Sequence, residues 1–397
     1  MLTALFPTFD IFKIAFIGDQ GAGENARAVL ELIKEENAQA IMHQGDFDYV
    51  RKPASWDSLI TAVLGADFPC FGTMGNHDSS RWDGNHGYQQ YLENRLMRAG
   101  IPWEGDLGVQ SCLHYEGIFL VQVAPGLRAA DHDIYIREQL ATDNSIWSIC
   151  SWHKNQNLMQ VGGMPDAVGW EVYEESRRGG AIIATAHDHS YGRTYLLSDM
   201  SSQIVASRSD TLVISKGESF VFVSGLGGRS IHNGRVEGNW WACTHNATQG
   251  ANYGALFGTF NANGQANLAT FYFKDITGRI IDRFTVRSEV EDIVTSAVDK
   301  SHALPAQIVL EQNYPNPFNP STTIRFRLAR PEQMKLTVRN ARGQLIRTVH
   351  DVEMPAGMHE LDWNGRDNDG FMVPSGTYFC RLESGSEVAT RKLVLVQ

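Results

Sequence analysis

Five short polar motifs, each placed where an apolar segment ends, constrain the fold of this chain more than any other feature. In chain order they are Gly18–Gly21 (GDQG), Gly45–Tyr49 (GDFDY), Gly75–Asp78 (GNHD), Cys150–His153 (CSWH) and Ala186–His189 (AHDH). Open α/β sheets bind ligands at the carboxyl ends of their strands. Glycine at the start of the first three motifs permits a tight exit from a strand. The pattern therefore predicts an α/β core whose strand ends carry one common site.

The segments between the motifs predict alternating strands and helices as far as Tyr191. Helices are expected over residues 24–37, where apolar side chains recur at helical spacing, and near 55–64. Strands are expected over residues 11–17, 40–43, 69–73, 111–114, 118–123, 146–152 and 181–186. Farther on, residues 211–214, 220–223, 253–260, 266–273 and 280–286 favour a mainly antiparallel sheet. We expect two sheets that pack together.

Composition narrows the class of protein. The chain of 397 residues is long enough for two domains, and its net charge of -11 argues against a nucleic-acid-binding surface. No apolar run is long enough for a transmembrane segment. The five cysteines include no CxxC pair and are interpreted as buried small side chains, with one disulfide possible. Met1–Phe12 is either the lead-in to the first strand or the remnant of a truncated signal peptide.

The motifs together offer carboxylate, amide, imidazole and phenol groups. Such ligands suit iron, manganese or zinc, and there are enough of them for two ions. The motifs together therefore predict a site for two metal ions.

In this order, the motifs resemble those of the calcineurin-like metallophosphoesterase superfamily, in its purple acid phosphatase branch, over residues 13–287. Many members of the superfamily have a histidine ligand where Gly21 stands, whereas purple acid phosphatases lack it and use a tyrosine in GDxxY, the place of Tyr49. Ala186 and Cys150 replace a usual glycine and valine without removing a ligand. The resemblance implies a four-layer αββα sandwich and a metal-dependent phosphoric ester hydrolase, similar to acid phosphatases.

The resemblance also implies a role for each residue. The first metal, expected to be Fe(III), would be held by Asp19, Tyr49 and His189. The second, Fe, Mn or Zn, would be held by Asn76, His153 and His187, and Asp46 would bridge the two. His77 would reach the substrate phosphate as a hydrogen-bond donor or general acid. For Tyr49, core packing or a hydrogen bond to a neighbouring loop is the alternative to metal binding, and for His77 the alternative is to support the ligands from behind. Arg193 would either orient the loop of His187 and His189 or contact phosphate.

Two bridged cations lower the pKa of a shared water, so the expected reaction is attack of a metal-bridging hydroxide on a phosphate monoester. A phosphodiesterase or nucleotidase on the same metal centre is one alternative. A surface-anchored binding protein with a vestigial metal site is another.

The end of the chain has a different character. Residues 288–306 are polar and are interpreted as a linker after a catalytic domain of residues 1–287. Residues 307–397 combine short alternating segments with turn signals and predict a small β-sandwich. The segments Gln312–Phe326, Trp363–Asp367 and Arg391–Val396 resemble the type A C-terminal sorting domain of the type IX (Por) secretion system. That resemblance implies an Ig-like fold, the type IX machinery as partner, and a secreted or cell-surface location, whereas a generic Ig-like accessory domain is the alternative.

Overall fold

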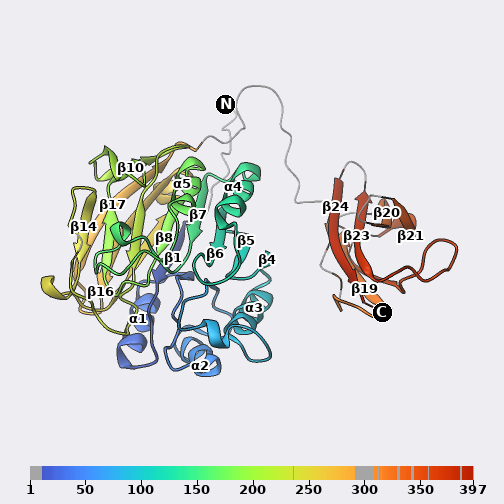
Figure 1. Ribbon diagram of the computed structural model, residues 1–397, viewed down its shortest axis with the longest axis horizontal. Helices are drawn as coiled ribbons and strands as arrows, with labels where there is room; N and C mark the ends of the chain where they lie inside the picture. Colours follow the sequence, from blue (N-terminus) through green and yellow to red (C-terminus); the bar gives the residue numbers. More distant parts are fainter. Residues whose placement is uncertain are drawn as a thin grey trace, which may run out of the picture. The chain divides into compact units, whose positions relative to one another are not determined.

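The computed structural model describes residues 11–235, 237–290, 308–310, 313, 315–328, 331–340, 344–355, 357–384 and 387–396. The chain divides into two compact units, Met1–Thr295 and Ser296–Gln397 (Figure 1). Residues 1–10, and all but the first three residues of the expected linker 288–306, lie outside the described residues. The interpretations of the N-terminus and the linker therefore stay predictions.

The first sheet of the larger unit holds the strands that precede the first three motifs. Its order is β12 (Thr211–Ile214), β17 (Ile280–Ser288), β16 (Leu268–Asp275), β15 (Gly254–Phe260), β1 (Phe12–Ile17), β2 (Ala40–His43) and β3 (Cys70–Gly72). Strands β1, β2 and β3 are parallel neighbours, and β15 pairs antiparallel with β1. The three motifs therefore emerge side by side at one edge of this sheet.

The second sheet holds the strands that precede the other two motifs. Its order is β14 (Trp241–His245), β9 (Tyr191–Thr194), β13 (Val221–Ser224), β8 (Ile182–Thr185), β7 (Trp147–Ser151), β6 (Ile118–Val123), β5 (Gln110–Tyr115) and β4 (Glu104–Asp106). Strands β6, β7, β8 and β13 are parallel. A separate hairpin consists of β10 (Leu196–Asp199) and β11 (Ile204–Ser207).

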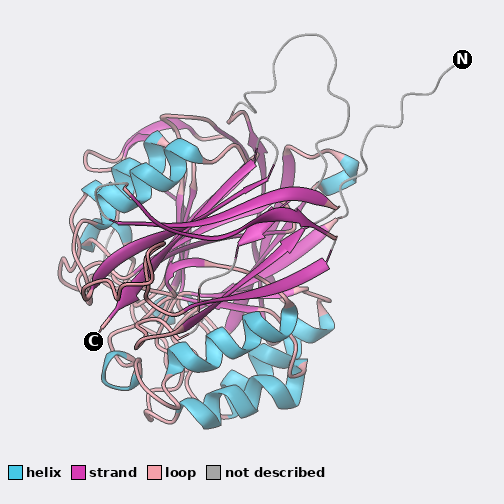
Figure 2. Ribbon diagram, turned by 90° about the vertical axis from the view of Figure 1, so that its right-hand side faces the viewer, coloured by secondary structure: helices cyan, strands magenta, loops and turns pink. Residues whose placement is uncertain are grey.

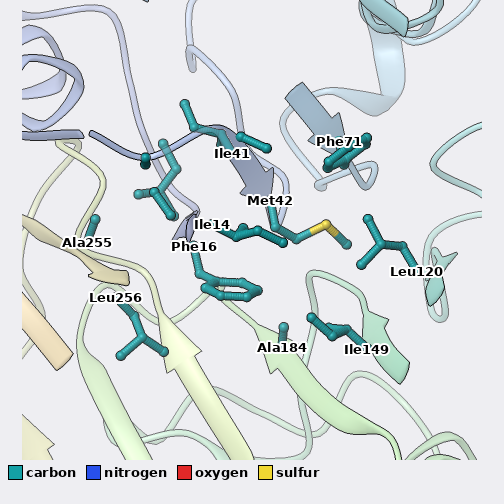
Figure 3. Close-up of a cluster of buried hydrophobic side chains, with 14 of the residues drawn as sticks. Ile14, Phe16, Ile41, Met42, Phe71, Leu120, Ile149, Ala184, Ala255 and Leu256 are labelled. Carbon is teal, nitrogen blue, oxygen red and sulfur yellow. The ribbon is translucent and has the colours of Figure 1, made fainter. Parts of the chain in front are cut away.

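The two sheets face each other across one apolar core. Phe16 and Met42 of the first sheet point toward Ile149 and Ala184 of the second (Figure 3). All four are fully buried, and each large apolar side chain so buried stabilises the fold by roughly 1.5–3 kcal/mol. At the ends of β1 and β13, the amide of Gly18 donates to the carbonyl of Ser224 at 2.8 Å. This bond brings the strand ends of the two sheets together.

Helices cover the outer faces of both sheets (Figure 2). Helices α1 (Glu24–Glu35), α2 (Pro53–Leu64) and α3 (Tyr88–Ala99) contribute to the core that contains the first sheet. Helices α4 (His132–Thr142) and α5 (Glu171–Arg178) contribute to the second core. The predicted αββα order of layers is confirmed.

Two parts of the predicted secondary structure were wrong or incomplete. The strands beyond Tyr191 do not form one mainly antiparallel sheet, because β12, β15, β16 and β17 extend the first sheet whereas β9, β13 and β14 extend the second. The helices α3, α4 and α5 were not predicted. In α4 only His132, Ile136 and Leu140 are buried, so its apolar face is one side chain wide and its helical period is weak.

The smaller unit is an all-β sandwich, as predicted. One sheet contains β18 (Ile308–Leu310), β19 (Thr322–Leu328) and β22 (Gly357–Trp363), and the other contains β21 (Leu345–Met354), β20 (Glu332–Asn340), β23 (Gly376–Ser384) and β24 (Glu387–Leu395). Its core includes Trp363, whose ring lies 5.5 Å from that of Phe318 and 5.4 Å from that of Tyr378.

The structure also bears on disulfide bonds and on membrane-spanning helices. All five cysteines are unpaired, and all but Cys243 are buried, as expected for small apolar side chains. None of the helices in the described ranges is long and apolar enough to cross a membrane.

Candidate metal centre

Four of the seven candidate ligands stand in a left-handed backbone conformation. The φ angles are 55° at Asp19, 57° at Asp46, 58° at Tyr49 and 69° at His187. Non-glycine residues adopt this conformation at a cost of order 1–3 kcal/mol each, and it persists only where the surrounding structure fixes it. Such strain gathers at functional sites, and here it turns the chain sharply after β1, β2 and β8.

One cluster joins Asp19, Tyr49 and His189. The Tyr49 hydroxyl donates to Oδ1 of Asp19 at 2.7 Å and lies 2.8 Å from Nε2 of His189. That Nε2 is 3.4 Å from the same carboxylate oxygen. The other ring nitrogen of His189 lies 2.5 Å from Oγ of Ser230, which fixes the direction of the imidazole. A phenol, a carboxylate and an imidazole thus converge on one point.

A second cluster joins Asn76, His153 and His187. Nε2 of His153 lies 3.1 Å from Oδ1 of Asn76 and 3.2 Å from Nδ1 of His187. Nδ1 of His153 donates to the carbonyl of Gln44 at 2.7 Å, so its proton points away and Nε2 faces the cluster.

Asp46 lies between the two clusters. Its Oδ2 is 3.4 Å from Nε2 of His153, and ligand atoms of Asp19, Asp46 and His153 all lie within 4.8 Å of one another. Within the described residues, Oδ2 of Asp19 is buried and has no hydrogen-bond partner. A buried carboxylate oxygen without a partner is costly, so this donor set fits cations.

The charges of the site shift the protonation of its own groups. Burial opposes a charge on His153, but the carboxylates of Asp46 and Asp19 outweigh it and raise the pKa of His153 to about 9. Burial and the neighbouring His153 lower the pKa of His187 to about 4. Burial and the same two carboxylates raise the pKa of the Tyr49 phenol well above its usual value. Protons therefore compete for this cluster of ligands, and metal binding would release them.

Three further aspartates hold the ligand loops. Asp78 accepts the amides of Asp46, at 2.8 Å, and Phe47, at 3.0 Å. Asp48 accepts the amides of residues 50, 51 and 52 and the hydroxyl of Tyr88. Asp188 lies 3.0 Å from Nδ1 of His232. All three aspartates are buried and act on backbone or supporting groups.

A glycine-rich turn after β13 closes over Asp19. A Cβ on Gly225 would meet the carbonyl of Asp188 at 2.1 Å and Oδ2 of Asp19 at 2.8 Å, so the approach requires glycine. The amide of Gly227 donates to the carbonyl of Gly18 at 3.0 Å. This turn therefore lines the first cluster.

His77 and Arg193 were both considered for the substrate side of the site. The side chain of His77 is 45% exposed, its amide donates to Oδ1 of Asp46 at 2.8 Å, and its ring packs on Tyr49 at 4.5 Å. Arg193 corrects our expectation. Its guanidinium is 3% exposed, bonds both carboxylate oxygens of Asp282 at 2.7 and 3.0 Å, and stacks on Phe284. The side chain of Arg193 is held in the core between β9 and β17 by these contacts and does not face the ligands.

Sequence reasoning missed two contributors near His189. Ser230 fixes its Nδ1, and His232 stacks on its ring at 4.2 Å with planes 9° apart. Both lie more than 40 residues farther along the chain, and only their closeness to the glycine-rich turn marks them in the sequence.

Two stretches of the chain match known families. Residues 12–191 match the calcineurin-like phosphoesterase family, and residues 316–387 match the FlgD Ig-like domain. None of the curated proteins compared with the chain matches it.

Among solved structures, purple acid phosphatase PPD1 from yellow lupin (Lupinus luteus) seeds gives a TM-score of 0.55 at 15% identity, covering 75% of this chain and 57% of that one. The chain thus spans a little over half the length of the lupin protein. GAP50 of Plasmodium gives 0.48 at 12% identity, covering 72% and 92%. PhoD gives 0.42 at 12% identity, covering 71% and 73%. At these identities the lupin structure supports the fold alone.

Proposed function

We propose that the calcineurin-like phosphoesterase domain of this chain, a metal-dependent phosphoester hydrolase, hydrolyses phosphate monoesters. Asp19, Tyr49 and His189 would hold the first of two cations, with Fe(III) the preferred ion. Asn76, His153 and His187 would hold the second, which would be Fe, Mn or Zn. Asp46 would serve both. The observation that carries the proposal is the phenol of Tyr49, whose hydroxyl lies between a carboxylate and an imidazole.

The tyrosine argues for a trivalent ion at the first site. Burial and two carboxylates raise the pKa of the Tyr49 phenol, so the free phenol stays protonated at neutral pH. A cation must therefore be strongly charged to displace the phenol proton and bind the phenolate, and Fe(III) is such a cation. When bound, two such cations supply Lewis acidity for water activation and for neutralising phosphoryl charge.

The chain's own groups would position the substrate. His77 is the exposed group beside the ligands, and its fixed amide holds its backbone next to Asp46. From there its imidazole would donate a hydrogen bond to a phosphoryl oxygen or a proton to the leaving alkoxide. The carboxylates and imidazoles of the two clusters would keep their geometry, because the loops that carry them are held by Asp48, Asp78 and Asp188.

Metal analysis and a visible spectrum of the purified full-length chain test the proposal. We expect two metals per chain, iron among them, and a violet or pink band from charge transfer between the phenolate and Fe(III). Hydrolysis of 4-nitrophenyl phosphate should exceed that of bis(4-nitrophenyl) phosphate. A preference for the diester would favour the phosphodiesterase reading. Absence of bound metal and of activity after loading with iron or manganese would favour the vestigial site.

A matched pair of variants isolates the tyrosine. Tyr49→Phe should remove the visible band and most of the activity. Tyr88→Phe, which also loses a hydroxyl bonded to an aspartate of this loop, should keep the band per bound iron. A band that survives Tyr49→Phe would refute the ligand assignment.

We also propose that the smaller unit directs export through the type IX machinery. The FlgD Ig-like match supports an Ig-like domain there, and the resemblance of its sequence segments to type A sorting domains supports the export role. Deleting residues 307–397 in the native bacterium should leave the phosphatase activity inside the cell. Unchanged activity outside the cell would show that the domain has another task.

A further inference from the structure

Arg229 stands at the metal centre with a fixed backbone and an exposed side chain. It follows the glycine-rich turn, and its amide donates to the carbonyl of Asp19 at 3.0 Å. A Cβ on Gly21 would lie 3.5 Å from Cα of Arg229, so the two loops are in direct contact. The position of Arg229 is therefore tied to the first cluster of ligands.

The guanidinium of Arg229 lies over the ring of Tyr49, 4.9 Å from the ring centre. The hydroxyl end of that ring is enclosed by Asp19 and His189, and the ring itself also contacts His77. Arg229 therefore lies over the ring of a candidate ligand, next to the first cluster. Two exposed groups flank Tyr49: the imidazole of His77, which is proposed to contact the substrate, and the guanidinium of Arg229.

Within the described residues, no carboxylate lies within ion-pair distance of Arg229. Some arginines of this unit do have such partners, for example Arg95 with Asp57 and Arg128 with Asp83. A guanidinium held over an aromatic ring keeps its fork of donors in a defined plane, and this fork matches a carboxylate with two parallel hydrogen bonds.

We propose that Arg229 is a specificity-determining residue that binds a carboxylate on the leaving group of the substrate. The inference rests on the proposed phosphatase function. The oxygens of the transferred phosphoryl group would face the ligand clusters and His77, so their negative charge would be balanced there without Arg229. The leaving group would extend toward the exposed side of Tyr49, where Arg229 meets it. The preferred substrates are then phosphate monoesters with a carboxylate a few bonds from the ester oxygen.

The test compares two substrates that differ by one carboxylate, O-phospho-L-serine and O-phosphoethanolamine. The reference is 4-nitrophenyl phosphate, whose leaving group carries neither a carboxylate nor an ammonium group. The full-length metal-loaded chain should prefer phosphoserine over phosphoethanolamine. Arg229→Gln should lower kcat/KM for phosphoserine about tenfold or more, mainly through KM, and change the other two substrates less than about threefold. Arg229→Lys should recover part of the loss, because it keeps the charge without the fork.

Arg208→Gln is the matched control. Arg208 is also exposed and stacked over a tyrosine ring, that of Tyr195 at 4.7 Å, but its side chain bonds the carbonyl of Asn239 and contacts none of the candidate ligands. It should leave all three substrates unchanged.

Equal losses on all three substrates, or no loss on any, for Arg229→Gln would overturn the inference while leaving the phosphatase in place. A wild-type chain that is metal-loaded but inactive on 4-nitrophenyl phosphate would overturn the proposed function itself, and the inference with it.

Discussion

Asp78 allows the sharpest test of how the ligand loops are held. The side chain is fully buried, and its two oxygens divide three backbone donors between them. Oδ2 accepts the amides of Asp46 and Gly75, both at 2.8 Å, and Oδ1 accepts that of Phe47 at 3.0 Å. A buried donor left without an acceptor costs about 1–3 kcal/mol.

These contacts predict an order of losses. Asp78→Ala leaves three donors unpaired, and we expect a loss of about 3–5 kcal/mol in the free energy of unfolding. Asp78→Asn can place its amide oxygen at the Oδ2 position and keep two of the three bonds, so its loss should be about 1–3 kcal/mol. Asp83→Ala, which removes an exposed partner of Arg128, should cost less than about 1 kcal/mol.

Urea titration of the metal-free chain, followed by tryptophan fluorescence, measures these differences. Of the nine tryptophans only Trp363 lies in the smaller unit, so the signal reports on the larger one. The same variants should bind metal in the same order of weakening, because Asp46 loses its backbone support. Equal losses for Asp78→Asn and Asp78→Ala, or a loss below 1 kcal/mol for Asp78→Ala, would refute the count of donors.

Three further predictions follow from single contacts. A methyl group at Gly225 would collide with backbone and with the first cluster, so Gly225→Ala should lower metal content after dialysis at least tenfold, whereas Gly23→Ala, which meets open space, should not. Arg193→Met leaves the buried Asp282 without its cationic partner and should cost about 3–5 kcal/mol in urea titrations without raising KM; a raised KM at full stability would restore the substrate role. Burial would raise the pKa of Glu36, but hydrogen bonds from a lysine and a tyrosine of β16 lower it. The stabilisation by Glu36 is therefore present above its ordinary pKa of 4.5 and is lost as the pH falls through its lower pKa in the folded protein. Glu36→Gln should lower the free energy of unfolding by about 1 kcal/mol at pH 7, and by much less near pH 3, as measured by thermal unfolding at the two pH values.

The sequence predicted the strands that precede the motifs because each is a short apolar run closed by a glycine or a polar ligand. The predicted bounds of β6 (Ile118–Val123) and β12 (Thr211–Ile214) match the structure. The distribution of the later strands between two sheets could not be predicted in the same way, because pairing such as that of β12 with β17 joins residues 74 positions apart, for example Thr211 and Thr285.

Arg193 shows the same limit within the site. Four residues after His189, it was a reasonable candidate for phosphate, and its polarity gave no sign of burial. Its partner, Asp282, lies 89 residues farther on in another sheet. The candidate ligands could be proposed from the sequence because each lies in a short motif directly after a strand. Ser230, His232 and Arg229 reach the metal centre only because the glycine-rich turn packs on Asp19, and no short motif marks that packing.

The central position of β1 has a consequence for how the protein matures. This strand leads into Asp19 and pairs on one side with β15, whose residues are made some 240 positions later. During synthesis β1 can find β2 early, but its other edge stays open until Gly254–Phe260 has left the ribosome. The turn over Asp19, from Gly225 to Arg229, also arrives late. The nascent chain therefore cannot assemble its first cluster before most of the larger unit has been made, and a chain shortened before β15 should accumulate without metal.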